Sequence, residues 1–384
     1  MKKTNIFTLF FMFLMFTFAF FSPISFSKPV FALKEESITS AKSMIVIERD
    51  SGRVLYSHNQ EEKLPMASTT KIITAIFAIE KNDDLDKSVS IPKEAVGIEG
   101  TSIGLKEGEH LTIRELLYGL MLRSGNDTAV ALAIETSGSL ENFVKEVNVF
   151  LREKGLNNTH LENPHGLPND NHYTTAEDLA MITAYALKNK TFAEIVSTKN
   201  KKISNELNSK YNRNLQNKNK LLSNMEFADG VKTGYTRKAG RCFVGSATKD
   251  DMQLICVLLN CGPMFEDCEK LLEKGFKEFK KYKLVANGDK LGFVDVKKSN
   301  VEKVDIISSK DFSYPLKRDE LKDVKLEVIK EKELVAPIKE EQQIAQVQIT
   351  LENQLIFSDK IYTIKEIKAN TFGSEFQRVI EKMM

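Results

Sequence analysis

The sequence lacks an excess of either charge, has no tryptophan and contains little cysteine. Its 384 residues carry 55 basic and 53 acidic side chains, which leaves a formal net charge of +2. This balance gives no argument for nucleic acid as a partner, because such binding requires a basic surface. The absence of tryptophan excludes nothing. The apolar fraction of 42% indicates a globular protein with a core, and the length allows one large domain and a smaller one.

The four cysteines follow no pattern of metal ligation. They are Cys242, Cys256, Cys261 and Cys268, and their spacing matches no Cys-x-x-Cys motif. The sequence therefore predicts no metal, and it predicts no cofactor either. Cys242 and Cys256 can face each other across a predicted hairpin, and an exported location would permit a disulfide between them. Buried free thiols are the alternative, because the strands around these residues are strongly apolar.

The N-terminal segment has the composition of a secretory signal peptide. Lys2 and Lys3 precede an apolar run at residues 6–21, and small residues follow up to Ala32. A charged start, an apolar centre and a small-residue exit are typical of a signal peptide, here cleaved after Ala32. An uncleaved membrane anchor is the alternative, because the run approaches the roughly 18 residues of a minimal span. Both interpretations place the rest of the chain outside the cytoplasm.

Hydrophobic periodicity predicts a mixture of helices and antiparallel strands in the first two thirds of the chain. Residues 68–80 are apolar on every side of a predicted helix, which is typical of a buried central helix. Residues 112–115 form a capping-box pattern before a second helix. The other predicted elements are two strands within residues 43–56, helices that begin near residues 126 and 175, a strand hairpin at residues 241–248 and 252–260, and a closing helix at residues 270–282.

After about residue 285 the pattern changes to alternating apolar and charged residues. This period of two predicts a small antiparallel β domain, whose default role is structural packing. Residues 371–384 form an amphipathic helix that we expect to lie in a membrane interface, with docking on the β domain as the alternative. The predicted division is residues 1–32 for the signal peptide, 33–283 for the main domain, 284–370 for the sandwich-like β domain and 371–384 for the helix.

Ser68 and Lys71 form a Ser-x-x-Lys tetrad at the start of the predicted central helix. Residues i and i+3 share a helix face, so the lysine amine can hydrogen-bond the serine hydroxyl. A hydroxyl needs a base to act as a nucleophile, and a partly buried lysine near another cation can supply one. The start of a helix also offers unpaired N–H groups to a developing negative charge. For an isolated match, however, an N-cap serine beside an exposed lysine is the commoner meaning.

Other Ser-x-x-Lys matches lack this context. Ser25 lies in the signal segment, and Ser246 lies on a predicted strand, where residues i and i+3 point to opposite faces. Only the tetrad at Ser68 opens a buried helix.

Ser-Gly-Asn at residues 124–126 lies between two predicted helices. We expect the Ser124 hydroxyl to relay protons near Lys71, and the Asn126 amide to hold peptide groups of a substrate. Taken alone, a glycine C-cap followed by an N-cap is the better explanation of this motif.

Lys-Thr-Gly at residues 232–234 opens a predicted strand. Glycine there allows a ligand backbone to approach closely, and a peptide substrate could add to the strand by main-chain hydrogen bonds. Lys232 would add positive charge beside Lys71, although an edge-strand lysine that discourages aggregation is the alternative. The three motifs, in this order and on three kinds of element, form the set required for acyl transfer through a serine ester.

With these motifs the chain resembles the serine penicillin-recognising enzymes, and more closely the low-molecular-mass D-alanyl-D-alanine carboxypeptidases. The likeness covers nearly the whole mature chain, and the small β domain and the terminal helix also fit. Four segments carry it: residues 65–71 around Ser68, Asn-Pro-His-Gly-Leu at 163–167, residues 173–180, and Asp-Gly-Val-Lys-Thr-Gly-Tyr-Thr at 229–236 with Ala239 and Gly240.

The resemblance implies an α+β fold and a reaction. The main domain would be a DD-peptidase/β-lactamase-like catalytic domain, with a central antiparallel sheet, helices on both sides and an all-helical lobe. Ser68 would attack the carbonyl between the two terminal D-alanines of a peptidoglycan stem pentapeptide, and water would hydrolyse the acyl-enzyme. β-Lactams would acylate the same serine.

The resemblance also implies roles for residues around Ser68. The backbone N–H groups of Ser68 and Tyr235 would form the oxyanion hole. Lys218 matches a position where relatives place a basic residue near the substrate carboxylate. The residues expected to bind substrate are Asn126, Lys218, Lys232, Thr233, Gly234, Tyr235 and Thr236.

Two departures and three alternatives accompany this interpretation. A carboxylate-binding arginine found in some relatives is not evident around residues 262–264, and Tyr235 replaces a frequent histidine, which can shift substrate preference. A class A β-lactamase would need a Glu-x-x-Leu-Asn arrangement, which is not seen near Glu162. A DD-endopeptidase or transpeptidase would share the acyl-enzyme. A penicillin-binding sensor or wall-scaffolding module is the non-enzymatic alternative.

Overall fold

The structure, a computed structural model, describes three segments and four single residues: 39–203, 212–331, 333–371, Gly373, Phe376, Ile380 and Met383. The predicted signal peptide lies outside the described residues, and so do most residues of the predicted terminal helix. The four single residues are helical. Within the described part of the chain, no helix is long and apolar enough to cross a membrane.

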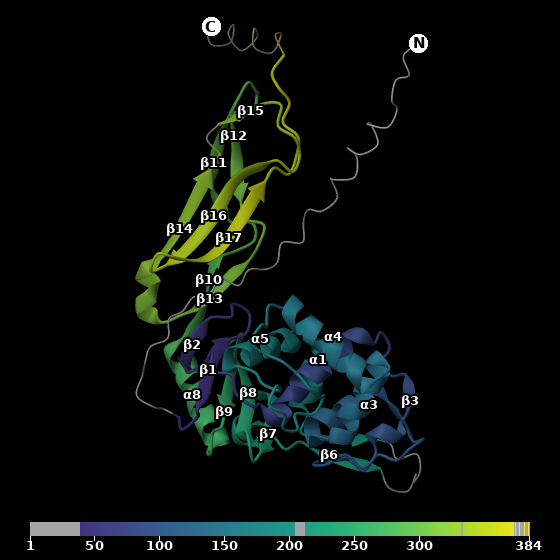
Figure 1. The fold of residues 1–384 in the computed structure, drawn as a ribbon. Helices are drawn as coiled ribbons and strands as arrows, with labels where there is room; N and C mark the ends of the chain where they lie inside the picture. Colours follow the sequence, from purple (N-terminus) through teal and green to yellow (C-terminus); the bar gives the residue numbers. More distant parts are fainter. Residues whose placement is uncertain are drawn as a thin grey trace, which may run out of the picture.

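A five-stranded antiparallel sheet organises the first part of the chain (Figure 1). Its strand order is β2-β1-β9-β8-β7, so strands from the start and the end of this part pair side by side, and β7 forms an edge. The strands are β1 (Ser43–Glu48), β2 (Val54–His58), β7 (Ala228–Thr236), β8 (Gly240–Lys249) and β9 (Met252–Leu259). The strand that carries Lys-Thr-Gly therefore has one free edge within this sheet.

Helices cover both faces of this sheet, as predicted. All six residues of β1 are buried. Ile45 packs into the core that contains helix α5 (Ala176–Leu187), and its neighbour Val46 packs into the core that contains helix α8 (Met264–Glu278). Successive side chains of a strand point to opposite faces, so neighbouring residues enter two different cores.

Helix α1 (Lys71–Lys81) is the buried central helix of the helical side. Residues 71–79 are all buried, and Phe77 packs edge-on against Phe143 at 5.6 Å. The predicted capping box at the start of α2 is present. The remaining elements of this part are α2 (Ile113–Tyr118), α3 (Asn126–Ser137), α4 (Leu140–Glu153), α6 (Lys190–Ser197), α7 (Leu221–Asn224), and the small hairpins β3 (Ser88–Ser90) with β4 (His110–Thr112) and β5 (Asn200–Ile203) with β6 (Arg213–Gln216).

The predicted closing helix is wrong at both ends. Helix α8 begins at Met264 and ends at Glu278. The next residues, Lys280–Val285, form strand β10, which pairs with β13 (Phe312–Leu316). Tyr282 packs against the core of the C-terminal part, and this tertiary contact overrides the helical spacing of the segment.

Cys242 and Cys256 do not face each other across the hairpin, and no disulfide joins them. The turn between β8 and β9 pairs Lys249 with Met252, and this register places Cys256 opposite Gly245. Cys242 pairs with Gly234 of β7 instead. All four thiols are free and buried, which is the alternative that the apolar strands suggested.

The C-terminal part consists of small antiparallel and mixed sheets around its own core (Figure 1). With the helices and the antiparallel sheet of the first part, it makes the α+β fold that was predicted. The domain boundaries at residues 283 and 370 stay predictions. The strands, besides β10 and β13, are β11 (Lys290–Lys297), β12 (Lys303–Ile307), β14 (Val324–Lys330), β15 (Leu334–Val335), β16 (Gln343–Leu351) and β17 (Gln354–Tyr362).

Arg53, in the hairpin between β1 and β2, fixes the C-terminal part to the first. Its side chain is only 3% exposed. The guanidinium lies 5.2 Å from the ring centroids of both Phe279 and Tyr314. It donates to the Pro315 carbonyl, and to the Glu320 carboxylate at 2.5 and 3.0 Å. Phe279 belongs to the core of the first part, whereas Tyr314, Pro315 and Glu320 belong to the C-terminal part, so this buried charge bridges the two parts.

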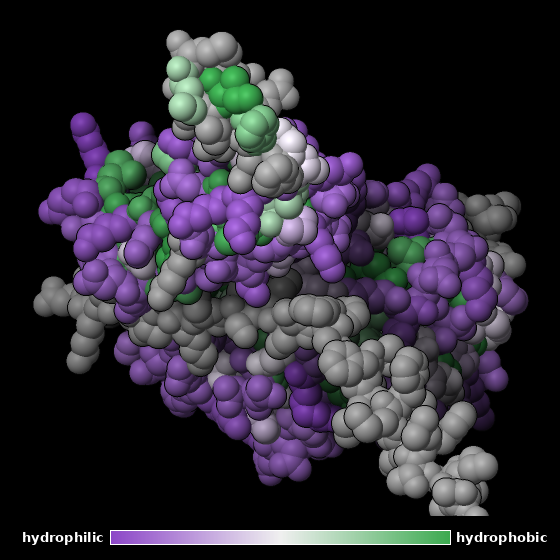
Figure 2. Space-filling view, turned by 90° about the horizontal axis from the view of Figure 1, so that it is seen from above, coloured by the Kyte–Doolittle hydropathy of each residue, from purple (hydrophilic) through white to green (hydrophobic). Residues whose placement is uncertain are grey.

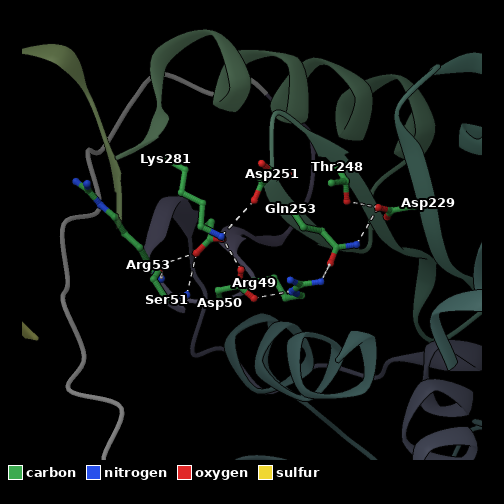
Figure 3. Close-up of polar contacts among 10 residues, drawn as sticks. Arg49, Asp50, Ser51, Arg53, Asp229, Thr248, Asp251, Gln253 and Lys281 are labelled. Atoms are coloured by element: carbon green, nitrogen blue, oxygen red, sulfur yellow. Dashed lines mark hydrogen bonds and ion pairs between the residues drawn. The ribbon is translucent and has the colours of Figure 1, made fainter. Parts of the chain in front are cut away.

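A chain of polar side chains connects β7 to β10 (Figure 3). Gln253 donates to Asp229 at 2.8 Å and accepts from Arg49 at 2.7 Å. Arg49 donates to Asp50 at 2.8 Å, and Lys281 of β10 donates to the same carboxylate at 2.6 Å. The first strand of the C-terminal part is thereby linked to the strand that carries Lys-Thr-Gly.

The surface at the end that carries the C-terminal part is mostly hydrophilic, with small groups of hydrophobic side chains (Figure 2). Among the described residues, Ile364 and Met383 are each 82% exposed and Phe376 is 61% exposed. Apolar side chains at this end are thus open to contact, while the membrane role of residues 371–384 stays a prediction.

Candidate active site

Ser68 lies on a strained turn that precedes the central helix. Residues Ala67–Thr70 form a 3₁₀ turn, and α1 begins only at Lys71. Ala67 has a φ of +47°, a conformation that residues with a side chain rarely adopt. Ser68 is half-buried, whereas the residues on either side of it are buried. The turn therefore leaves the Ser68 hydroxyl accessible at the start of α1.

Lys71 is fully buried, and its amine faces Ser68. The Nζ atom lies 3.0 Å from Ser68 Oγ, 2.7 Å from Asn126 Oδ1 and 2.8 Å from the His165 carbonyl oxygen. The structure thus brings the tetrad and the Ser-Gly-Asn motif together at one nitrogen.

The contacts of Asn126 determine where the protons of this amine point. Asn126 Nδ2 donates to the Glu99 carbonyl at 2.5 Å, so Oδ1 is the atom that faces Lys71. Asn126 Oδ1 and the His165 carbonyl can only accept, so two N–H bonds of Lys71 are directed at them. Lys71 Nζ also donates to Ser68 Oγ when it is protonated. A neutral amine has two N–H bonds and one lone pair, so loss of that proton would turn the lone pair toward Ser68. This geometry is suitable for a base. Asn126 orients the Lys71 amine, because both the oxygen and the nitrogen of the Asn126 amide are hydrogen-bonded.

Burial and neighbouring cations favour the neutral form. Burial lowers the pKa of Lys71 well below its usual range, and the charges of Lys232 and Lys218 lower it further. Burial, followed by the charge of Lys218, lowers the pKa of Lys232 to about 7. Removal from water penalises an ammonium group, and so does a like charge nearby.

Strand β7 lies directly against the turn of Ser68. A Cβ atom at Gly234 would lie 3.0 Å from Ser68 N and 3.1 Å from Thr69 N. Glycine is therefore the residue that allows this approach. Lys232 is 1% exposed, and its Nζ donates to the Thr233 carbonyl at 2.9 Å. The Lys-Thr-Gly motif and Ser68 thus share one site.

The other predicted substrate-binding residues lie at the rim. Tyr235 is 65% exposed, and Thr233 and Thr236 are half-buried. Lys218 is exposed, and its Nζ lies 3.4 Å from Thr101 Oγ1. These side chains are accessible to a ligand that enters beside β7.

Ser124, rather than the glycine that follows it, adopts the left-handed conformation at this helix junction. Its φ is +64°, and it ends a short π-helical turn at Gly119–Arg123. The expected glycine C-cap is therefore wrong, and Gly125 instead forms the N-cap of α3. Ser124 is 5% exposed. Among the hydrogen bonds of the described residues, none joins Ser124 Oγ to Lys71.

Half-buried His165 and buried His172 lie beside the site, and the sequence analysis assigned a role to neither of them. The His165 carbonyl accepts from Lys71, and burial, with the charge of Lys71, lowers the pKa of its imidazole to about 3. His172 Nε2 lies 2.8 Å from Thr70 Oγ1. In the sequence, Gly166 was the residue that could have indicated these neighbours of the Ser68 turn. Its φ is +87°, and a Cβ atom there would lie 1.9 Å from the Ala67 carbonyl oxygen.

Comparison with known proteins places most of the chain in two families. Residues 30–262 match the family described as D-alanyl-D-alanine carboxypeptidase, and residues 279–369 match the C-terminal domain of penicillin-binding protein 5. The first match alone spans more than half of the chain. The chain belongs to the D-alanyl-D-alanine carboxypeptidase family.

Relatives within this carboxypeptidase family are similar over nearly the full length. D-Alanyl-D-alanine carboxypeptidase DacF of Bacillus subtilis is 31% identical over 368 residues, 94% of each chain. DacA of Escherichia coli is 30% identical over 350 residues, 87% of this chain and 85% of that one. The solved structure of penicillin-binding protein 5 from Haemophilus influenzae covers 88% of this chain and all of its own, with a TM-score of 0.75 at 26% identity.

Membership in the carboxypeptidase family confirms the predicted resemblance and a serine-type DD-carboxypeptidase hydrolase. The β-lactamase and sensor alternatives are not favoured. The Streptomyces K15 DD-transpeptidase structure is also similar, at 31% identity and a TM-score of 0.59. It covers 64% of this chain and all of its own.

Proposed function

We propose that the chain removes the terminal D-alanine from peptidoglycan stem pentapeptides through an acyl-enzyme on Ser68. The observation that carries this proposal is the buried Lys71 amine, whose Nζ lies 3.0 Å from Ser68 Oγ. As Oγ attacks the carbonyl carbon between the two D-alanines, Lys71 Nζ accepts the serine proton. The oxyanion then lies against the backbone N–H groups of Ser68 and Tyr235.

Acylation ends when the C–N bond breaks. The proton held by Lys71 passes to the departing amine, with Ser124 Oγ as the relay, and the terminal D-alanine leaves. Water then attacks the ester carbonyl, Lys71 accepts a proton from the water, and this proton returns to Ser68 Oγ as the shortened peptide is released. A positioned base of this kind contributes roughly 10²–10⁴-fold to a rate.

Lys232 supplies the charge that holds the carboxylate of the terminal D-alanine. The hydroxyls of Thr233 and Thr236 hydrogen-bond the same group, and Lys218 at the rim adds positive charge. The substrate backbone lies along β7, where Gly234 leaves it room. β-Lactams, which carry a comparable carboxylate, acylate Ser68 in the same position.

We propose an exported protein whose substrate lies outside the cytoplasm. The charged and apolar N-terminal segment supports cleavage after Ala32, and the exposed apolar residues Phe376 and Met383 support contact of residues 371–384 with the membrane surface. Deletion of residues 371–384 should move the protein from the membrane fraction to the soluble fraction. Unchanged fractionation would count against the contact.

D-Alanine release tests the activity. The protein without residues 1–32 is incubated with a peptide ending in D-Ala-D-Ala, beside Ser68→Ala, and free D-alanine is followed. Release by the parent alone is expected. Absence of release, or equal release by Ser68→Ala, would contradict the proposal. Slow turnover of a bound penicillin distinguishes this enzyme from a β-lactamase, and transfer to an added amine would reveal transpeptidation.

A further inference from the structure

The turn that presents Ser68 does not hold its conformation by itself. Ala67 has a φ of +47°, which is unfavourable for an L-residue with a Cβ atom. Such a conformation persists only where surrounding contacts impose it. Ala67 is 2% exposed, so these contacts come from the protein interior.

Two side-chain hydroxyls and one glycine impose the turn. Thr69 Oγ1 donates to the Met66 carbonyl at 2.6 Å, and Thr70 Oγ1 donates to the Ala67 carbonyl at 2.7 Å. The Ala67 carbonyl also packs on Gly166, where any Cβ atom would lie 1.9 Å from it. Carbonyl oxygens only accept, so each hydroxyl uses its single proton on the turn.

The Thr70 hydroxyl therefore has only acceptor capacity left for its other partner. That partner is His172 Nε2, at 2.8 Å, so Nε2 must carry a proton. The opposite ring nitrogen, Nδ1, lies 3.0 Å from the Glu162 backbone N–H, which can only donate. Nδ1 is therefore unprotonated, and the imidazole is neutral. One directed chain runs from Glu162 N–H through His172 and Thr70 to the Ala67 carbonyl.

We propose that His172, as the neutral Nε2–H tautomer, is a positioning residue that locks the Ala67–Thr70 turn and so aims Ser68 at its substrate. His172 acts through Thr70, which lies next to Lys71 in the chain. The inference rests on the proposed function in one respect, namely that Ser68 is the nucleophile.

The surroundings keep this imidazole neutral. His172 is 3% exposed, and burial, with the charges of His160 and Lys71, holds its pKa at about 4. His165, the other titratable group that faces it, is also held neutral by burial. Protonation of Nδ1 would replace the bond from Glu162 by a contact between two donors.

Two amide substitutions at His172 separate the two hydrogen bonds of the imidazole ring. His172→Gln can place an N–H donor near the position of Nε2 and keep the bond to Thr70. His172→Asn can place an oxygen near the position of Nδ1 and keep the bond from Glu162, but it cannot reach Thr70. Each variant loses one hydrogen bond of the same kind, so the two should melt at similar temperatures.

Acylation of Ser68 by a fluorescent penicillin, measured as a second-order rate constant, should separate the two variants. His172→Asn should be slower by about 100-fold, the effect of a misplacement of about 1 Å. His172→Gln should remain close to the parent. Equal rates in the two variants, whether equally slow or unchanged, would overturn the proposal and leave His172 as a core residue.

Thr70→Val provides the second test, because it removes the hydroxyl through which His172 acts. If the proposal is right, adding His172→Asn to Thr70→Val slows acylation no further, since both changes break the same chain. Independent, multiplying effects would contradict it. Ser68→Ala tests the nucleophile assignment separately from the role of His172. If penicillin still labels the Ser68→Ala protein, Ser68 is not the nucleophile, whatever the His172 variants do.

Discussion

At the scale of single residues, the proposed mechanism uses two buried lysines in different protonation states. Lys71 can act as a base only when neutral, and Lys232 can attract a carboxylate only when charged. Burial lowers the pKa of both, and the charge of Lys232 lowers that of Lys71 further. Rising pH therefore favours the neutral form of Lys71, and it discharges Lys232 as the pH passes about 7.

We expect kcat/KM for a D-Ala-D-Ala peptide to fall as the pH rises through about 7, because Lys232 loses its charge. Lys232→Arg stays protonated and should remove this falling limb. D-Alanine release between about pH 5 and pH 9 measures the limb. Lys283→Arg, on the exposed side of β10, is the control. A falling limb that persists in Lys232→Arg would exclude Lys232 as its source.

Gly166 is a second residue on which the geometry of the site depends. Its φ is +87°, and a Cβ atom would lie 1.9 Å from the Ala67 carbonyl. Gly155 has a similar φ of +78° but open space around its Cβ position. A comparison of Gly155 with Gly166 therefore distinguishes the effect of backbone strain from the effect of a clash with the turn of Ser68.

Gly155→Ala should lower the free energy of unfolding by about 1 kcal/mol, the cost of its left-handed backbone. Gly166→Ala adds the clash and should cost about 2–4 kcal/mol in total. Only Gly166→Ala should slow penicillin acylation, by about 100-fold, because only it displaces the turn. Urea unfolding and acylation rates measure the two effects. Similar acylation rates in both variants would show that the turn tolerates displacement.

At the scale of elements, strand β7 is held in place by polar contacts at its start. Its pairing with β8 shifts at Asp229, a local irregularity of the kind that redirects a strand. The Asp229 carboxylate accepts from Thr248 at 2.5 Å and from Gln253 at 2.8 Å (Figure 3). It also accepts from Ser246 at 2.5 Å. Three donors from β8 and β9 thus fix the residue that leads into Lys232.

Asp229→Ala should lower the free energy of unfolding by about 2–4 kcal/mol. It leaves Ser246 and Gln253, which are 0% and 6% exposed, without an acceptor, and each such loss costs about 1–3 kcal/mol. Asp229→Asn keeps one oxygen and should cost less. Asp305→Ala, which breaks only the exposed pair with Lys290, should change stability little. If urea unfolding gives the same free energy of unfolding for Asp229→Ala and Asp305→Ala, the anchoring role of Asp229 is contradicted.

At the scale of the whole molecule, Arg53 is the main polar attachment between the two parts that the structure describes. Its guanidinium lies between Phe279 and Tyr314 and is paired with Glu320. Removing one partner of a buried ion pair costs about 3–5 kcal/mol, because the other charge is left without compensation. Since Glu320 is 18% exposed, the lower end of this range applies.

Arg53→Ala should therefore loosen the C-terminal part while leaving the catalytic site intact. We expect a larger radius of gyration in small-angle scattering and faster proteolysis near residues 280–285, with penicillin acylation of Ser68 unchanged. Lys283→Ala, which removes only an exposed pair with Asp311, is the matched control. Scattering identical to that of the parent would show that the remaining contacts suffice to hold the two parts together without Arg53.

The sequence determined those features that depend on near neighbours along the chain. An apolar surface on every side of residues 71–79 requires burial, and the Thr112 to Glu115 pattern caps a helix wherever that helix packs. The order of the three motifs, with the resemblance that they carry, was enough to predict the α+β fold and the carboxypeptidase family.

Only the tertiary structure decided what depends on contacts between distant residues. Strand register separated Cys242 from Cys256, and packing in the C-terminal part made Lys280–Val285 a strand. The position of the Lys71 amine and the tautomer of His172 follow from hydrogen bonds to residues far away in the sequence. The periodicity of apolar residues shows which face of a helix or strand is apolar. The position of a proton, in contrast, depends on which donors and acceptors lie close together in the folded protein.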